Sequence, residues 1–87
     1  MKQVLMFVKG GCPFCRAALN WMQEACAENP RYREISVKIV DELEEPQYAD
    51  QFDYYLVPTY YVQDDKVHEG IASKKIVTNV FERALEE

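Results

Sequence analysis

The feature that most constrains the fold is an unbroken apolar run, Val4 to Val8, which a glycine pair and an amphipathic segment follow directly. Apolar residues without alternation are typical of a strand covered on both faces, which requires a sheet with helices on each side. From Cys15 to about Glu28, apolar residues recur at spacings of three and four, as on one face of a helix. The chain therefore opens with a strand, a tight turn and a helix.

Two cysteines, Cys12 and Cys15, lie at the junction between this strand and this helix. A thiol at a helix N-terminus faces unpaired backbone N–H groups and the positive end of the helix dipole, and both stabilise the thiolate. The thiolate is the reactive form in disulfide exchange. Pro13 suits the first helical turn, because its missing N–H would have no partner there. The Cys-x-x-Cys spacing near a strand–helix–strand pattern therefore indicates a thiol–disulfide redox site.

The remaining patterns predict further strands and helices, with proline and glycine residues at their ends. The expected elements are, in chain order, a strand at 4–8, a helix at 15–28, a half-covered strand at 32–40, a short helix at 47–52 after an acidic loop, a strand at 56–62, a strand at 66–69, and a helix that begins after its N-cap Ser73. The first two strands should be parallel, with a right-handed crossover, and the last two antiparallel. We predict an α/β domain spanning residues 1–87, with a mixed four-stranded sheet, element order β-α-β-α-β-β-α, and helices on both faces.

Composition limits the partners of this chain. Ten basic against fifteen acidic residues give a net charge of −5, with no basic stripe, which argues against nucleic-acid binding. The N-terminal apolar run is too short for a signal-peptide core or a membrane span. Three cysteines, an odd number, do not fit a disulfide-stapled secreted scaffold. We therefore expect a cytoplasmic protein with reduced cysteines and no membrane contact, and we expect it to act as a monomer.

Two motifs together resemble a glutaredoxin of the thioredoxin superfamily. The tetrad Cys12-Pro13-Phe14-Cys15 is similar to the glutaredoxin active-site motif. The dipeptide Val57-Pro58, about 45 residues later, is similar to the cis-proline dipeptide of the family. The resemblance covers nearly the whole chain in its element order. It implies a thioredoxin-like fold and the activity of a dithiol–disulfide oxidoreductase.

The resemblance also implies a role for each motif residue. Cys12 would be the nucleophile and Cys15 the resolving thiol, and the two would form the redox disulfide. A cis bond before Pro58 would lie beside the cysteines, with the backbone of Val57 pairing with an extended substrate. The substrates would be protein disulfides or glutathione mixed disulfides, with glutathione as a co-substrate and with no bound cofactor or metal.

Two further residues are expected at the substrate site. Lys9 matches a basic position that glutaredoxins use near the thiolate and the glutathione carboxylate. Phe14, between the cysteines, should be exposed as a substrate contact, and Tyr54 or Tyr55 could rim the site. The stretch 68–73 lacks the Gly-Gly pair and the following acidic residue with which glutaredoxins hold the far end of glutathione. The stretch Gly70-Ile71-Ala72-Ser73-Lys74 looks more like the corresponding thioredoxin segment.

Two alternatives stay open at this point. One is a thioredoxin-like electron carrier that a flavoprotein reductase, rather than glutathione, reduces. The other is a metal or iron–sulfur carrier that uses Cys12 and Cys15, although zinc usually takes four Cys or His ligands. The remaining soft donors are Cys26, which the helical pattern places among buried apolar residues, and His68, expected as a half-exposed strand residue.

Overall fold

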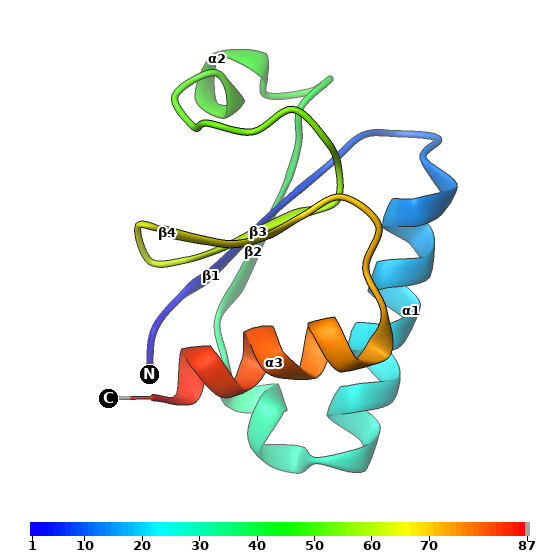
Figure 1. Ribbon diagram of the computed structural model, residues 1–87, viewed down its shortest axis with the longest axis vertical. Helices are drawn as coiled ribbons and strands as arrows, with labels where there is room; N and C mark the ends of the chain where they lie inside the picture. Colours follow the sequence, from blue (N-terminus) through cyan, green and yellow to red (C-terminus); the bar gives the residue numbers. More distant parts are fainter. Residues whose placement is uncertain (87) are drawn as a thin grey trace.

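The apolar run forms an inner strand of a four-stranded sheet in the computed structural model, which describes residues 1–86 (Figure 1). The elements are, in chain order, β1 (Val4–Val8), α1 (Pro13–Glu28), a 3₁₀ helix η1 (Pro30–Glu34), β2 (Val37–Asp41), α2 (Pro46–Ala49), β3 (Thr59–Val62), β4 (Asp65–Glu69) and α3 (Lys74–Leu85). The predicted small α/β domain with a mixed four-stranded sheet is confirmed. Within the described residues, no helix has the length and apolar character to cross a membrane.

The strands lie in the order β2-β1-β3-β4. β1 pairs parallel with β2 and antiparallel with β3, and β3 pairs antiparallel with β4. Because β1 has a neighbour on each side and cover on each face, all five of its residues are buried. A register shift interrupts the β3–β4 ladder between Tyr60 and Tyr61. The parallel first pair and the antiparallel last pair are those that the sequence predicts.

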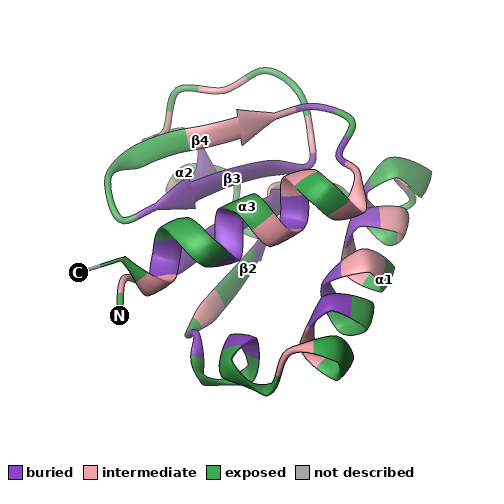
Figure 2. Ribbon diagram, turned by 60° about the horizontal axis from the view of Figure 1, so that its bottom comes forward, coloured by how far each residue is buried: buried purple, intermediate pink, exposed green. Residues whose placement is uncertain are grey.

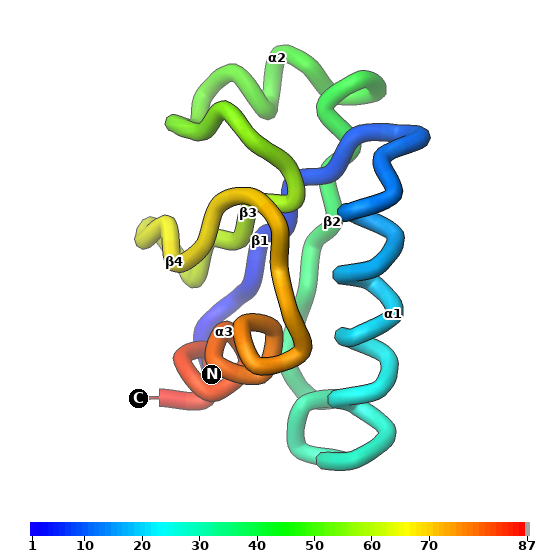
Figure 3. The backbone as a smooth tube through the Cα atoms, turned by 45° about the vertical axis from the view of Figure 1, so that its right-hand side comes forward, coloured from blue at the N-terminus to red at the C-terminus, as the bar shows by residue number. Residues whose placement is uncertain are grey.

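Hydrophobic side chains pack on both faces of the sheet. Figure 2 shows buried residues in β3 and along α1 and α3. On one face, Val4, Met6 and Val8 pack with α1 and α3. On the other face, Leu5 and Phe7 pack with Val40 of β2, Ala49 of α2 and Tyr61 of β3. The helices therefore cover both faces, as expected for a strand without alternation. Figures 1 and 3 show the turn from β1 into α1 at the same end of the sheet as α2.

The strand predicted at 32–40 is wrong in its first half, where the chain forms η1 and β2 begins only at Val37. Pro30 occupies the first turn of η1, and the side chain of Asn29 caps it by accepting the N–H of Arg31 at 3.1 Å. Tyr32 packs against Phe81 of α3, with ring centroids 5.1 Å apart. These contacts with a distant helix outweigh the local alternation that favours a strand.

Other differences concern where elements begin and end. α1 begins two residues before the predicted start, at Pro13, while α2 ends at Ala49 rather than at 52. β3 begins at Thr59, after the proline rather than before it. Ile39 in the edge strand β2 is 48% exposed. Ser73 caps α3 as predicted, since its Oγ accepts the N–H of Ile76 at 3.1 Å.

Candidate functional site

The turn from β1 into α1 places Cys12 at the N-cap of that helix. Gly11 adopts φ +83°, which glycine takes without the steric cost of a Cβ atom. The N–H of Cys12 donates to the carbonyl of Lys9 at 3.1 Å, and its own carbonyl accepts the N–H of Arg16 at 3.2 Å. The backbone therefore fixes Cys12 at the positive end of the helix, where the sequence predicts it.

The surroundings of Cys12 favour its thiolate. Partial burial raises the pKa of this thiol, but the Cys15 thiol, the N–H groups of Cys15 and Phe14 and the charge of Lys9 outweigh it and lower the pKa. The neutral side chain makes no capping hydrogen bond, so these donors act mainly on the negative form. A partly exposed thiol with a lowered pKa is the ordinary condition of a reactive cysteine.

The pKa of Cys15 is shifted in the opposite direction. Cys15 is 4% exposed, and burial raises its pKa to about 11, with further raising effects from Cys12 and from the carboxylate of Glu42. A hydrogen bond with the backbone of Lys9 lowers it in part. All three cysteines are free thiols. The two thiols of the motif therefore differ: Cys12 ionises more readily than an ordinary thiol, and Cys15 keeps its proton at neutral pH.

The Val57–Pro58 bond is cis, as the resemblance implies. Val57 and Cys12 both pack against the cluster on the face covered by α1 and α3, and Val57 also packs against the cluster on the opposite face. The carbonyl of Pro58 accepts the N–H of Gly70 at 2.9 Å. Within residues 1–86, no hydrogen bond uses the N–H or the C=O of Val57. These two groups are free to pair with another chain.

Exposed apolar side chains occur in the first turn of α1 and in the loops around residues 56 and 71. Phe14 is 50% exposed, as predicted, and Tyr55, Leu56 and Ile71 are exposed more fully. Leu56 lies against Gly70, where an added Cβ would come within 3.5 Å of its Cδ1 atom. A pocket of about 210 Å³ adjoins the cysteines, and its lining consists of Val8, Lys9, Gly10, Gly11, Cys12, Cys15, Arg16 and Leu19.

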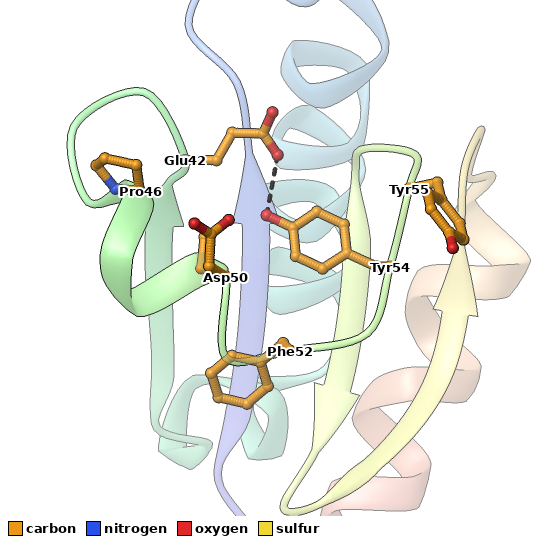
Figure 4. Close-up of a pocket in the computed structure, with 7 residues that line it drawn as sticks. Glu42, Pro46, Asp50, Phe52, Tyr54 and Tyr55 are labelled. Carbon is orange, nitrogen blue, oxygen red and sulfur yellow. Dashed lines mark hydrogen bonds between the residues drawn. The ribbon is translucent and has the colours of Figure 1, made fainter.

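Tyr54 and Tyr55 do not line the pocket beside the cysteines. They line a second pocket of about 320 Å³ (Figure 4). The Tyr54 hydroxyl donates to Glu42 Oε1 at 2.9 Å, and its ring stacks on Phe7 with centroids 4.6 Å apart. Burial raises the pKa of Tyr54, and the Glu42 carboxylate raises it further. Figure 4 shows Tyr55 turned away from this pair. Sequence reasoning treated Glu42 as part of an acidic loop, and nothing local indicates its contact with Tyr54.

Cys26 is partly exposed rather than fully buried. It lines an apolar groove of about 470 Å³ between α1, η1 and β2, together with Leu19, Met22 and Ile39. The stripe on α1 is therefore only half covered at this position, because the chain forms η1 instead of extending β2. His68 is half-buried, and its Nε2 lies 2.9 Å from the carbonyl of Ile71. Across residues 1–86, no three His, Cys, Asp or Glu side chains gather as metal ligands.

The chain is similar to a solved structure described as "Structure of a malarial protein", with a TM-score of 0.70. The two chains are 17% identical, and the likeness covers 95% of this chain and 96% of the other. No protein-family model and no curated protein matches the sequence. At this identity the likeness shows a shared fold and does not identify an activity.

Proposed function

We propose that this protein is a dithiol–disulfide oxidoreductase with a thioredoxin-like fold that works in the manner of a glutaredoxin. The observation that carries the proposal is the contrast between two neighbouring thiols, Cys12 with a lowered pKa and Cys15 with a pKa raised to about 11. Two cysteines that serve only to pack in the core require no difference in pKa. A nucleophile with a protonated resolving partner requires it.

The reaction proceeds through two exchanges. The Cys12 thiolate attacks one sulfur of a substrate disulfide, forms a mixed disulfide, and releases the other sulfur as a thiolate. Cys15 then loses its proton and displaces the substrate, so that the substrate leaves fully reduced and Cys12–Cys15 becomes a disulfide. Two electrons from glutathione, as two molecules of the thiol, or from a reductase restore the dithiol. A reducing compartment such as the cytoplasm suits this cycle.

The raised pKa of Cys15 falls during this cycle. Two of its causes are the hydrogen bond with Cys12 and the negative charge on Cys12. Once Cys12 is a disulfide sulfur, it carries no charge, and both causes disappear. Cys15 therefore becomes easier to deprotonate at the stage when its thiolate is needed.

For glutathione, the candidate contacts are Lys9, Phe14, Val57 and Pro58. The charge of Lys9 suits a carboxylate, and the free backbone groups of Val57 suit the peptide-like part of glutathione. The test is turnover of a glutathionylated peptide with glutathione as the only reductant, by wild type and by Cys15→Ser. Activity that persists in Cys15→Ser and is lost in Cys12→Ser would support the glutaredoxin mechanism. No turnover by wild type would refute dependence on glutathione.

A second candidate is a thioredoxin-like carrier for protein disulfides, which a flavoprotein reductase reduces. The exposed apolar side chains of Phe14, Leu56 and Ile71 favour it, because exposed apolar side chains suit protein partners better than a small charged peptide. Reduction of the wild type by thioredoxin reductase, without turnover by glutathione, would favour this candidate. In either case we expect the protein to act as a monomer.

A further inference from the structure

Glu69, the last residue of β4, reaches across to the loop that precedes Pro58. Its Oε2 accepts the N–H of Tyr55 at 2.6 Å and the N–H of Leu56 at 2.9 Å. Its other oxygen, Oε1, accepts from the ammonium group of Lys66 at 2.7 Å. One carboxylate therefore joins the loop to the end of the hairpin. We call these two backbone contacts the Glu69 clamp.

The clamp completes a set of contacts around Val57. On one side, the carbonyl of Leu56 accepts the hydroxyl of Thr59. On the other side, the carbonyl of Pro58 accepts the N–H of Gly70. The backbone groups next to Val57 are thus held, while its own N–H and C=O have no partner among the described residues. Val57 as a whole residue is half-buried. Buried backbone groups without partners are costly, so this arrangement suits a site that another polypeptide or water completes.

We propose that Glu69 is a positioning residue for substrate, whose carboxylate holds residues 55 and 56 so that the backbone of Val57 can pair with an extended polypeptide beside Cys12. This inference rests on the proposed function, because it assumes that a disulfide-bearing chain binds there. The two N–H groups are adjacent and converge on one oxygen, which an anionic acceptor satisfies more strongly than a neutral one.

The carboxylate stays ionised through the neutral range. Lys66 and the N–H groups of Tyr55 and Leu56 lower the pKa of Glu69 to about 2. The groups around it are therefore one cation and two amides, with no facing acidic side chain among the causes of the shift. The clamp does not open by protonation under ordinary conditions.

Loss of the clamp should affect binding more than chemistry. Without it, the loop must be ordered each time that substrate binds, and this entropy cost weakens binding. Glu69 is absent from the groups that shift the pKa of Cys12 or of Cys15. We therefore expect a higher KM for a polypeptide disulfide, with kcat and the ultraviolet absorbance of the Cys12 thiolate unchanged.

The experiment compares wild type and three variants as catalysts of the reduction of a peptide disulfide. Dithiothreitol regenerates each enzyme, and the rate without enzyme is subtracted. Glu69→Ala should raise KM by roughly tenfold, since two charge-assisted hydrogen bonds are lost. Glu69→Gln should recover most of this loss, because an amide oxygen can accept both N–H groups. The matched control, Lys66→Gln, removes the ion pair but leaves the clamp, so its KM should stay close to that of wild type.

A second measurement follows the clamp itself. Amide hydrogen exchange at Tyr55 and Leu56 should be faster in Glu69→Ala than in Lys66→Gln. If Glu69→Ala does not fold, Glu69→Asp serves in its place, because it keeps the charge but shortens the reach by one methylene, and its KM should also rise. An unchanged KM in a folded Glu69 variant, or an equal rise in Lys66→Gln, would overturn the inference. A wild type without any disulfide turnover would overturn the proposed function, and the inference with it.

Discussion

Replacing Cys15 by alanine or by serine separates two roles of this side chain. Beyond its proposed role as resolving thiol, its S–H is the foremost of the groups that favour the Cys12 thiolate over the neutral thiol. Alanine removes that donor. Serine keeps an O–H at nearly the same place. The backbone N–H groups and Lys9 remain in both variants, so the comparison isolates one hydrogen bond.

The size of the effect follows from the worth of one such bond. A net hydrogen bond contributes about 1 kcal/mol, and roughly 1.4 kcal/mol corresponds to a tenfold change in an equilibrium. Below the pKa of Cys12, the thiolate population in Cys15→Ala should therefore fall about fivefold relative to wild type. Cys15→Ser should stay close to wild type. The cavity left by alanine is one sulfur atom in size, at a site that is 4% exposed.

The assay is the ultraviolet absorbance of the thiolate, followed against pH in each variant. Alkylation rates are a weaker measure, because a thiolate of higher pKa is also more nucleophilic, which offsets part of the effect. Cys12→Ser gives the background from Cys15 and Cys26. Identical titration curves for Cys15→Ala and wild type would refute the idea that Cys15 stabilises the Cys12 thiolate. A shift of equal size in Cys15→Ser would refute the role of its hydrogen bond.

Three further predictions concern charge, backbone and pH. Lys9→Gln should raise the pKa of Cys12, because it removes a nearby positive charge, and the shift should shrink in high salt; a salt-independent shift would contradict this. Gly11→Ala should lower the free energy of unfolding, measured in urea, by about 1 kcal/mol, because φ is +83° although no atom lies within 4 Å of an added Cβ. Gly11→Asn should lose less. Equal losses in the two variants would argue against a backbone cause. The folded protein keeps the Cys15 proton up to a pKa of about 11, while the unfolded chain releases it near the ordinary value of 9.0. The stability that this proton contributes is complete below pH 9.0 and is lost as pH rises toward about 11. Wild type should therefore lose stability over that range relative to Cys15→Ser. Parallel pH profiles of the two proteins would exclude this contribution.

The cysteine end of the molecule could be predicted from the sequence because its determinants are local. The apolar run, the glycine turn and Pro13 lie within ten residues of one another, and the N-cap position of Cys12 follows from them. The exposure of Phe14 follows as well, since a side chain beside a reactive thiol at a helix N-terminus has little to pack against. The contrast between the two thiols needed the structure, because the burial of Cys15 depends on the whole sheet.

The failures share one cause, which is contact between distant segments. The alternation at 32–40 looks like a strand, but Tyr32 turns toward α3, where its hydroxyl donates to Glu82 at 2.6 Å. Glu69 looks like an ordinary strand residue until its partners, 13 and 14 positions earlier, are known. Local pattern fixes neither of these contacts, so neither η1 nor the Glu69 clamp could be predicted from it.

The two ends of the described chain lie together, since the N–H of Lys2 donates to the carbonyl of Ala84 at 2.8 Å (Figure 1). Both ends lie beside the start of β1, whereas Cys12 follows the other end of that strand. A tag, a solid support or a fused domain attached at either end is therefore joined to the same side of the molecule, at a distance from the thiols. Immobilising the protein through either end, or through both, should leave the cysteines open to the protein disulfides proposed as substrates.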